Sequence, residues 1–197
     1  MSSQRICIVG ASHHASLRIY PYIGAAGAQI VGVCDLDEGK ASNNASLFGG
    51  RPYSDLTRML EFEKPDGVIV SIGPEQHAEL APIIMRRGIS VYTEKPPAST
   101  TGTAFEVAQV SNETGILCTT AFEKRYADAY SRAREWIDAH KAENLYSISI
   151  DYGSGQYPYR GSKTPFLLDF AIHVIDLVGY LFGDAEEVFS FSKGTDA

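Results

Sequence analysis

Short apolar runs recur along the first 120 residues of the chain, separated by longer segments of mixed polarity. The runs cover residues 5–9, 29–34, 67–71, 89–92 and 116–119, and each predicts a buried β-strand. The segments between them predict helices at residues 14–26, 40–48, 55–62, 76–87 and 101–114. Strands that alternate with helices over short connections predict an α/β fold, with a doubly wound parallel sheet and right-handed crossovers.

The pattern changes after Thr120. Residues 127–140 predict an amphipathic helix, residues 145–150 alternate with the period of a half-exposed antiparallel strand, and residues 166–182 predict an apolar helix. One more strand is predicted at residues 187–191. We therefore expect two domains, a parallel-sheet domain at residues 1–120 and part of a second domain at residues 121–197.

Composition and charge argue against several kinds of partner. The formal net charge is −7 and the basic residues are scattered, which is untypical of a nucleic-acid or anionic-membrane binder. No apolar run approaches the ~20 residues that a membrane span needs. Residues 1–7 lead directly into the first predicted strand, so we expect no signal peptide. The cysteine count is odd, without close pairs, so we expect no disulfide framework, no metal site and a reduced, cytoplasmic protein.

The turn after the first strand carries a dinucleotide-binding pattern. It reads Gly10-Ala11-Ser12-His13-His14-Ala15, which is G-x-G-x-x-G/A with serine at the second glycine. Such a turn lets the backbone approach a pyrophosphate at the start of a helix, and the Ser12 hydroxyl could donate to a phosphate. The alternative interpretation is an ordinary tight turn between a strand and a helix.

Asp35 closes the second predicted strand and strengthens the dinucleotide interpretation. A carboxylate at this place accepts hydrogen bonds from the ribose hydroxyls of the adenosine. It would repel a 2′-phosphate, and no basic residue follows directly, so NAD is favoured and NADP is the alternative. Asp35 could instead cap the next helix.

The carboxyl ends of parallel strands are where such sheets bind ligands. The third strand ends at Ser71, and the turn of Ile72 and Gly73 leads to a helix that carries His77. A single histidine at such a place is more often structural than functional. The predicted cofactor-binding residues are therefore Gly10, Ala11, Ser12, His13, His14, Asp35, Ser71, Ile72, Gly73, His77, Glu94 and Lys95.

Two further motifs predict the chemistry of an alcohol/carbonyl redox site. Lys95 lies between Glu94 and a proline, which holds it extended and lets its charge stabilise a substrate oxygen. Asp169 and His173 are four residues apart in the apolar helix, so on a regular α-helix they share a face. Asp169 can then orient His173 as a general base. A surface turn and a buried structural pair are the alternatives.

Arg125 and Tyr152 are candidate substrate contacts, together with Lys95, Asp169 and His173. Aromatic faces and an arginine fork suit sugars and carboxylates. A solvated helix start at residues 123–126 is the alternative for Arg125.

These motifs together resemble the glucose–fructose oxidoreductase / inositol dehydrogenase family (Gfo/Idh/MocA). The resemblance implies an N-terminal Rossmann domain and a C-terminal α+β domain with a mostly antiparallel open sheet. It implies NAD(P)-dependent oxidation of a sugar, cyclitol or related polyol, and a homo-oligomer, either dimer or tetramer. Family members are usually longer, so we expect this chain to be truncated at its C-terminus.

The predicted reaction is hydride transfer between a secondary hydroxyl and nicotinamide, with Lys95, Asp169 and His173 as catalytic residues. One alternative is a non-catalytic dinucleotide-binding sensor on the same fold. Another is lyase or glycosidase chemistry that NAD assists.

Overall fold

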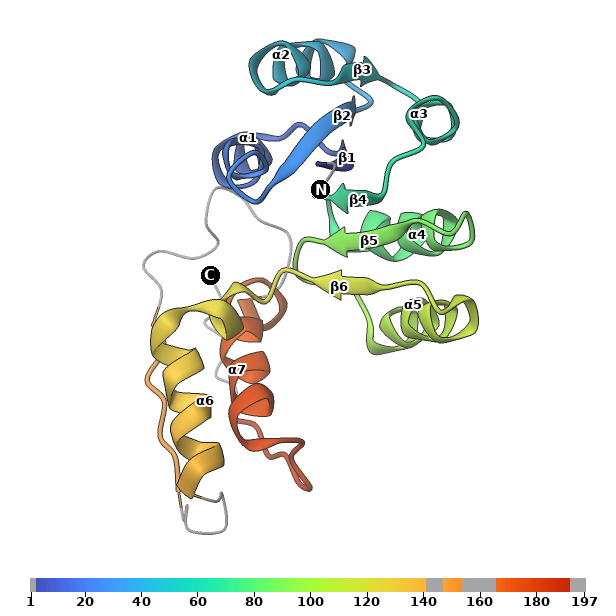
Figure 1. Cartoon of the computed structure of the whole chain (residues 1–197). Coiled ribbons are helices and arrows are strands. Elements are labelled where there is room, and N and C mark those ends of the chain that lie inside the picture. Colours follow the sequence, from blue (N-terminus) through green and yellow to red (C-terminus); the bar gives the residue numbers. More distant parts are fainter. Residues whose placement is uncertain (1–2, 141–146, 154–165, 192–197) are drawn as a thin grey trace, which may run out of the picture. The chain divides into compact units, whose positions relative to one another are not determined.

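A computed structural model of the protein describes residues 3–140, 147–153 and 166–191 (Figure 1). The chain divides into two compact units, Met1–Ala121 and Phe122–Ala197. Each unit is described by itself below. Among the described residues, no helix has both the length and the apolar character to cross a membrane.

The first unit is built on one six-stranded parallel sheet. Its strands lie in the order β3-β2-β1-β4-β5-β6, and every neighbouring pair is parallel. Their bounds are β1 Gln4–Val9, β2 Ala28–Cys34, β3 Arg51–Tyr53, β4 Gly67–Val70, β5 Ser90–Thr93 and β6 Cys118–Thr120. The predicted doubly wound Rossmann sheet is confirmed.

Helices cover both faces of this sheet (Figure 1). They are α1 His13–Arg18, a 3₁₀ turn η1 Tyr20–Tyr22, α2 Glu38–Phe48, α3 Leu56–Glu63, α4 Pro74–Met85 and α5 Thr101–Thr114. The long helix predicted at residues 14–26 was wrong, because α1 ends at Arg18 and a 3₁₀ turn containing Pro21 follows. Proline lacks the N–H that would continue an α-helix.

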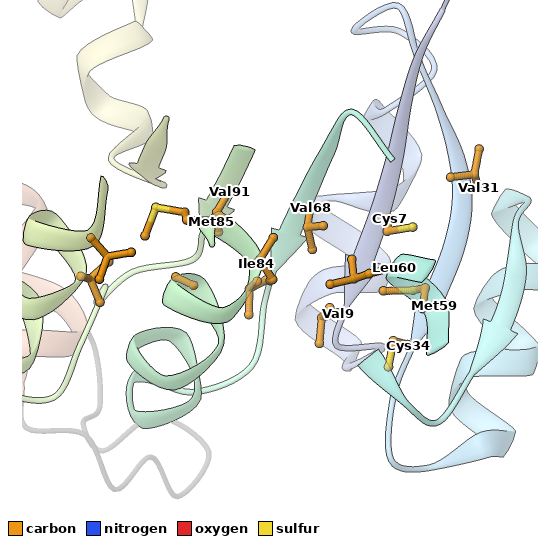
Figure 2. Close-up of a cluster of buried hydrophobic side chains, with 14 residues drawn as sticks. Cys7, Val9, Val31, Cys34, Met59, Leu60, Val68, Ile84, Met85 and Val91 are labelled. Atoms are coloured by element: carbon orange, nitrogen blue, oxygen red, sulfur yellow. The ribbon is translucent and has the colours of Figure 1, made fainter. Parts of the chain in front are cut away.

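Two apolar cores lie on opposite faces of the sheet because successive side chains of a strand point to opposite sides. In β1, Cys7 and Val9 pack with α3, α4 and α5, whereas Ile8 packs with α1 and α2. Figure 2 shows the first of these cores, in which Met59 and Ile84 are fully buried. Strands buried on both faces explain the continuous apolar runs in the sequence.

The third strand in chain order escaped sequence prediction. β3 comprises only Arg51–Tyr53, lies at the edge of the sheet and contains Pro52. Within sheets, proline is confined to edge strands or bulges, and the edge position of β3 accommodates Pro52.

Gly10 lies at a very close approach between two strand ends. Its φ is +103°, and a Cβ built on it would lie 2.1 Å from the carbonyl oxygen of Ser71. No side chain fits in that space. The backbone after β1 therefore lies directly against the backbone after β4, and residue 10 must be glycine.

The second unit contains two packed helices. A 3₁₀ turn η2 Glu123–Tyr126 precedes α6 Asp128–His140, and a π-helical segment η5 Leu167–Ala171 runs into α7 Ile172–Phe182. Ile137 of α6 packs with Leu177 and Leu181 of α7. The amphipathic and apolar helices predicted for this region are present.

The two strands predicted in this unit are not found. Residues 147–150 and 187–191 have no strand structure, while residues 145 and 146 lie outside the described residues. A period-two pattern predicts which side chains share a face, but a strand also needs a hydrogen-bonded partner. No strand among the described residues of the second unit supplies one.

Gly10→Ala should destabilise the protein by about 3 kcal/mol or more. Overpacking a tight site costs about 1–3 kcal/mol, and left-handed backbone adds roughly 1–2 kcal/mol for a residue with a Cβ. Urea unfolding followed by far-UV circular dichroism measures this loss. Gly115→Ala is the matched control, because its φ is +67° and nothing lies within 4 Å of the added Cβ. Equal losses in the two variants would contradict the proposed close approach.

Candidate active site

The turn after β1 is held by the end of β2. The Gly10 N–H donates to the carbonyl of Cys34 at 2.8 Å, and the Ala11 N–H donates to Asp35 Oδ2 at 2.7 Å. Ser12 caps α1, with its Oγ accepting from the Ala15 N–H at 3.3 Å. In that bond Ser12 Oγ is the acceptor. The hydroxyl proton, which is predicted to donate to a phosphate, is not used by it.

Asp35 is part of this turn and does not cap the next helix. The N-cap of α2 is Asp37, whose Oδ1 accepts from the Lys40 N–H at 3.1 Å. The capping alternative for Asp35 was therefore wrong by two residues. Its second oxygen, Oδ1, accepts from the Asp37 N–H at 2.9 Å. Both oxygens are fixed by backbone donors, which orients the carboxylate at the strand end.

A pocket of about 350 Å³ opens beside these groups. Its lining is mostly apolar and comes from the ends of β1 and β2, the segment between β3 and α3, the start of α3, the segment after β4 and the first half of α4: Val9, Gly10, Cys34, Asp35, Leu36, Ser54, Leu56, Ile72, Gln76, Glu79 and Leu80. Leu36 lines this pocket and is 93% exposed, so it presents apolar surface to the solvent there. Burial, with the charges of Asp35 and Asp55, raises the pKa of Cys34 to about 11, so its thiol stays neutral.

Ser54, Gln76 and Glu79 line the pocket but were not among the predicted site residues. Ser54 directly follows β3, the strand that sequence reasoning missed. The i, i+3 spacing of Gln76 and Glu79 at the start of α4 was the available signal, since such residues share a helix face.

His77 is buried and uses both ring nitrogens in bonds to backbone. Its Nε2 accepts from the Ile72 N–H at 3.1 Å, so the ring proton is on Nδ1, which donates to the carbonyl of Pro96 at 2.8 Å. Burial lowers the pKa of His77, against smaller opposing effects of Pro96 and Glu94. The neutral ring is thus the form that this site holds.

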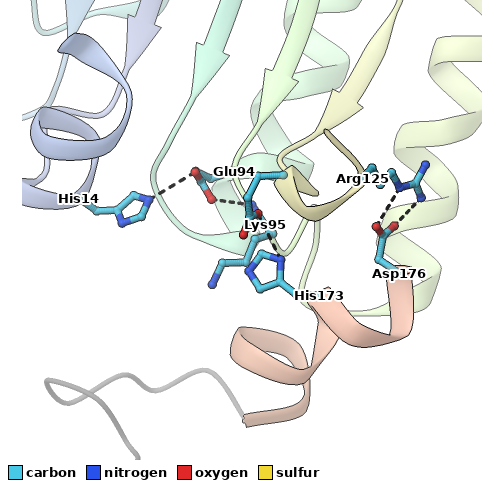
Figure 3. A network of polar contacts seen from close by, with 7 residues as sticks. His14, Glu94, Lys95, Arg125, His173 and Asp176 are labelled. Atoms are coloured by element: carbon cyan, nitrogen blue, oxygen red, sulfur yellow. Dashed lines mark hydrogen bonds and ion pairs between the residues drawn. The ribbon is translucent and has the colours of Figure 1, made fainter. Parts of the chain in front are cut away.

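Glu94 links the turn after β5 to α1. The Glu94 N–H donates to the carbonyl of Val70 at 2.9 Å, and its Oε2 accepts from the backbone N–H of Lys95 at 3.0 Å. The other oxygen, Oε1, lies 3.4 Å from His14 Nε2 (Figure 3). Three predicted cofactor-binding residues, His14, Glu94 and Lys95, are therefore brought together in the first unit.

In the second unit, Arg125 and Asp176 form a two-point ion pair (Figure 3). Arg125 Nε donates to Asp176 Oδ2 at 2.8 Å, and Nη2 donates to Oδ1. The hydrogen bond to Asp176 is the main cause that raises the pKa of Arg125. The predicted substrate contact at Arg125 would use a guanidinium that is already held in place.

His173 lies beside a carboxylate of the second unit, and its predicted pairing with Asp169 stays a prediction. The ring is buried, and its Nδ1 lies 3.3 Å from Glu123 Oε2. Asp169 lies in the π-helical segment, where hydrogen bonds run between residues i and i+5, so the regular α-helical spacing assumed for the pair was wrong. Glu123, the carboxylate beside His173, was not among the predicted site residues.

Tyr152 packs on the same helical segment. Its ring stacks on Phe170 with 4.7 Å between the ring centroids, and Lys124 Nζ lies 5.4 Å from the centroid of the Tyr152 ring.

Lys95 belongs to the first unit and His173 to the second, so their convergence on one substrate stays a prediction. In the part of the chain that the structure describes, no cluster of three or more potential ligands could hold a metal ion.

Comparison with known proteins places the chain in a family. Residues 4–122, more than half of the chain, match the family described as "Oxidoreductase family, NAD-binding Rossmann fold". The chain belongs to this family, and the resemblance to Gfo/Idh/MocA proteins is confirmed.

Individual relatives are distant. The chain is 26% identical over 178 residues to inositol 2-dehydrogenase 2 of Saccharopolyspora erythraea, which covers 89% of this chain and 51% of that protein. It is 32% identical over 124 residues to glycosyl hydrolase family 109 protein 1 of Akkermansia muciniphila, covering 58% and 26%. The chain thus spans about half or less of the length of these relatives.

A solved structure shows the same fold. It is the WlbA dehydrogenase from Bordetella pertussis, solved in complex with NADH and UDP-GlcNAcA. The TM-score is 0.80 at 20% identity, over 92% of this chain and 56% of that one.

The stability conferred by His77 should depend on pH. At pH 7.5, His77→Gln should cost about 1–3 kcal/mol, since the donor to the buried Pro96 carbonyl is lost. Below pH ~6.5 the unfolded wild-type chain binds a proton, whereas the folded chain resists protonation because the pKa of His77 is lowered. Wild-type stability then falls and the gap between the two proteins narrows.

Urea unfolding of both proteins at pH 7.5 and pH 5.5 measures this gap. The other titrating groups are common to both chains and cancel in the difference. A gap that stays constant or widens at pH 5.5 would show that His77 is not held neutral.

Proposed function

We propose that the protein is an NAD-dependent oxidoreductase that moves a hydride between a secondary hydroxyl of a sugar, cyclitol or related polyol and nicotinamide. The observation that supports it best is the pocket bordered by Gly10, Asp35 and Ile72, in a chain of the NAD-binding oxidoreductase family. The polyol class follows from the name of the relative that acts on inositol.

The residues at the pocket fit the adenosine end of NAD. Its volume of about 350 Å³ lies within the range of small-molecule sites, roughly 300–1,000 Å³. Leu36 and Ile72 offer apolar surface to an adenine ring. Each Asp35 oxygen already accepts one backbone N–H and keeps a second lone pair for a ribose hydroxyl. The same charge disfavours the 2′-phosphate of NADP.

Three side chains would carry out the chemistry. His173 takes the proton of the substrate hydroxyl as general base, and because Nδ1 faces Glu123, the accepting atom is Nε2. Asp169 and Glu123 orient the ring and stabilise its charged form. Lys95 donates to the substrate oxygen and stabilises developing negative charge. The nicotinamide, when bound, accepts the hydride.

A second candidate is glycoside cleavage assisted by NAD, favoured by the likeness to a glycosyl hydrolase family 109 protein. The cofactor would then return to its starting state within each turnover, so NADH would not accumulate while product forms. A homo-oligomer and a cytoplasmic location remain part of the proposal for the whole protein.

Turnover separates these possibilities. A screen with NAD over inositols, hexoses and hexose phosphates should yield NADH absorbance at 340 nm with at least one substrate. His173→Ala should lower kcat by about 10²–10⁴-fold, the usual contribution of a general base, while leaving the Kd for NADH nearly unchanged. NADH binding without any turnover would favour the sensor alternative, and equal loss of kcat and NADH affinity would contradict the assigned role of His173.

Asp35→Ala should weaken NADH binding by about 10–100-fold, because a hydrogen bond to a charged group contributes about 1.5–3 kcal/mol. NADPH binding should suffer less, since the charge that opposes its phosphate is also removed. Fluorescence titration measures both values of Kd. Asp37→Ala is the matched control: it removes a neighbouring carboxylate that caps α2 and does not line the pocket. Similar effects of the two variants on NADH would refute the role of Asp35.

A further inference from the structure

We infer that His77 is a positioning residue that couples the cofactor-binding segment after β4 to the turn that carries Lys95. This inference rests on the proposed function and assigns His77 a positioning role in the proposed site. His77 was predicted as a cofactor contact, but its two ring nitrogens are engaged with backbone on either side. The ring is 1% exposed.

The two segments joined by His77 have different roles. Ile72, whose N–H donates to His77 Nε2, lines the pocket. Pro96, whose carbonyl accepts from His77 Nδ1, directly follows Lys95. One imidazole therefore fixes a wall of the proposed cofactor site and the residue next to the proposed catalytic lysine.

The sheet itself does not hold these segments beyond the strand ends. Ser71 N–H donates to the Val9 carbonyl and Glu94 N–H donates to the Val70 carbonyl, which extends the ladder by one residue past β4 and past β5. Ile72 and Pro96 lie further on. His77, from the first turn of α4, supplies the donor and the acceptor that these two backbone groups require.

Each bond can be removed alone. Glutamine can place an amide oxygen near the position of Nε2 and so keeps the acceptor for Ile72, but it lacks the donor to Pro96. Asparagine is shorter and can place its amide nitrogen near Nδ1, which keeps the donor to Pro96 and loses the acceptor for Ile72. The glutamine variant thus tests the bond to Pro96 alone, and the asparagine variant tests the bond to Ile72 alone.

The test measures NADH affinity by fluorescence and backbone amide exchange by mass spectrometry on the whole chain. His77→Asn should weaken NADH binding on the order of tenfold and speed exchange in residues 71–73. His77→Gln should keep NADH affinity within about twofold of wild type and speed exchange in residues 94–98 instead.

Tyr53→Phe is the control for a merely structural loss. It removes only the hydrogen bond from the Tyr53 hydroxyl to Glu63 (2.6 Å), and neither of these two side chains lines the pocket. It should lower thermal stability while leaving NADH affinity unchanged.

The inference is overturned if His77→Asn and His77→Gln weaken NADH equally, or if exchange rises in the same residues in both. Failure of the wild-type chain to bind NADH would overturn the proposed function instead, and the exchange pattern would still decide whether His77 couples the two segments.

Discussion

The backbone contact between residue 10 and residue 71 is the constraint on which the first unit depends. With the Ser71 carbonyl oxygen 2.1 Å from where a Cβ would lie, only glycine allows β1 and β4 to end side by side. This contact brings the turn after β1 and the segment after β4 to the same edge of the sheet. The pocket that we assign to the cofactor opens between them, and also takes part of its wall from β2.

Single polar side chains then join the loops that leave this edge. Asp35 binds the turn after β1, His77 joins the segments after β4 and β5, and Glu94 lies between Lys95 and His14. Each makes hydrogen bonds or ion pairs with groups that take no part in the hydrogen bonds of the sheet. Such bonds are individually modest, about 1–3 kcal/mol when buried, but they decide the positions of groups that must match a ligand closely.

Features of the fold were predictable from the sequence where a pattern of neighbouring residues was enough to specify them. Continuous apolar runs predicted the buried strands, and the glycine-containing turn with Asp35 predicted the sheet edge where the pocket that we assign to the cofactor opens. β3 was missed because three residues with a proline carry no strand pattern of their own and depend on pairing with β2. The strands predicted at residues 147–150 and 187–191 were wrong for the opposite reason, since a strand-like sequence does not form a strand without a pairing partner.

Site chemistry was less predictable than the fold because it depends on contacts between distant residues. Nothing local distinguishes Asp35 from Asp37 as the helix cap, and only the structure shows that Asp37 has that role. The π-helical segment at Leu167–Ala171 and the approach of Glu123 to His173 arise from the packing of the second unit. The predicted roles of Lys95, Asp169 and His173 as a catalytic set remain proposals.

Amide exchange of the wild-type chain with and without saturating NADH tests the central claim most directly. If the dinucleotide binds at the carboxyl edge of the sheet, protection should rise in residues 10–15, 35–37 and 71–77. Protection confined to the separate pocket lined by Arg51, Arg58 and Phe62, or no change at saturation, would contradict the account.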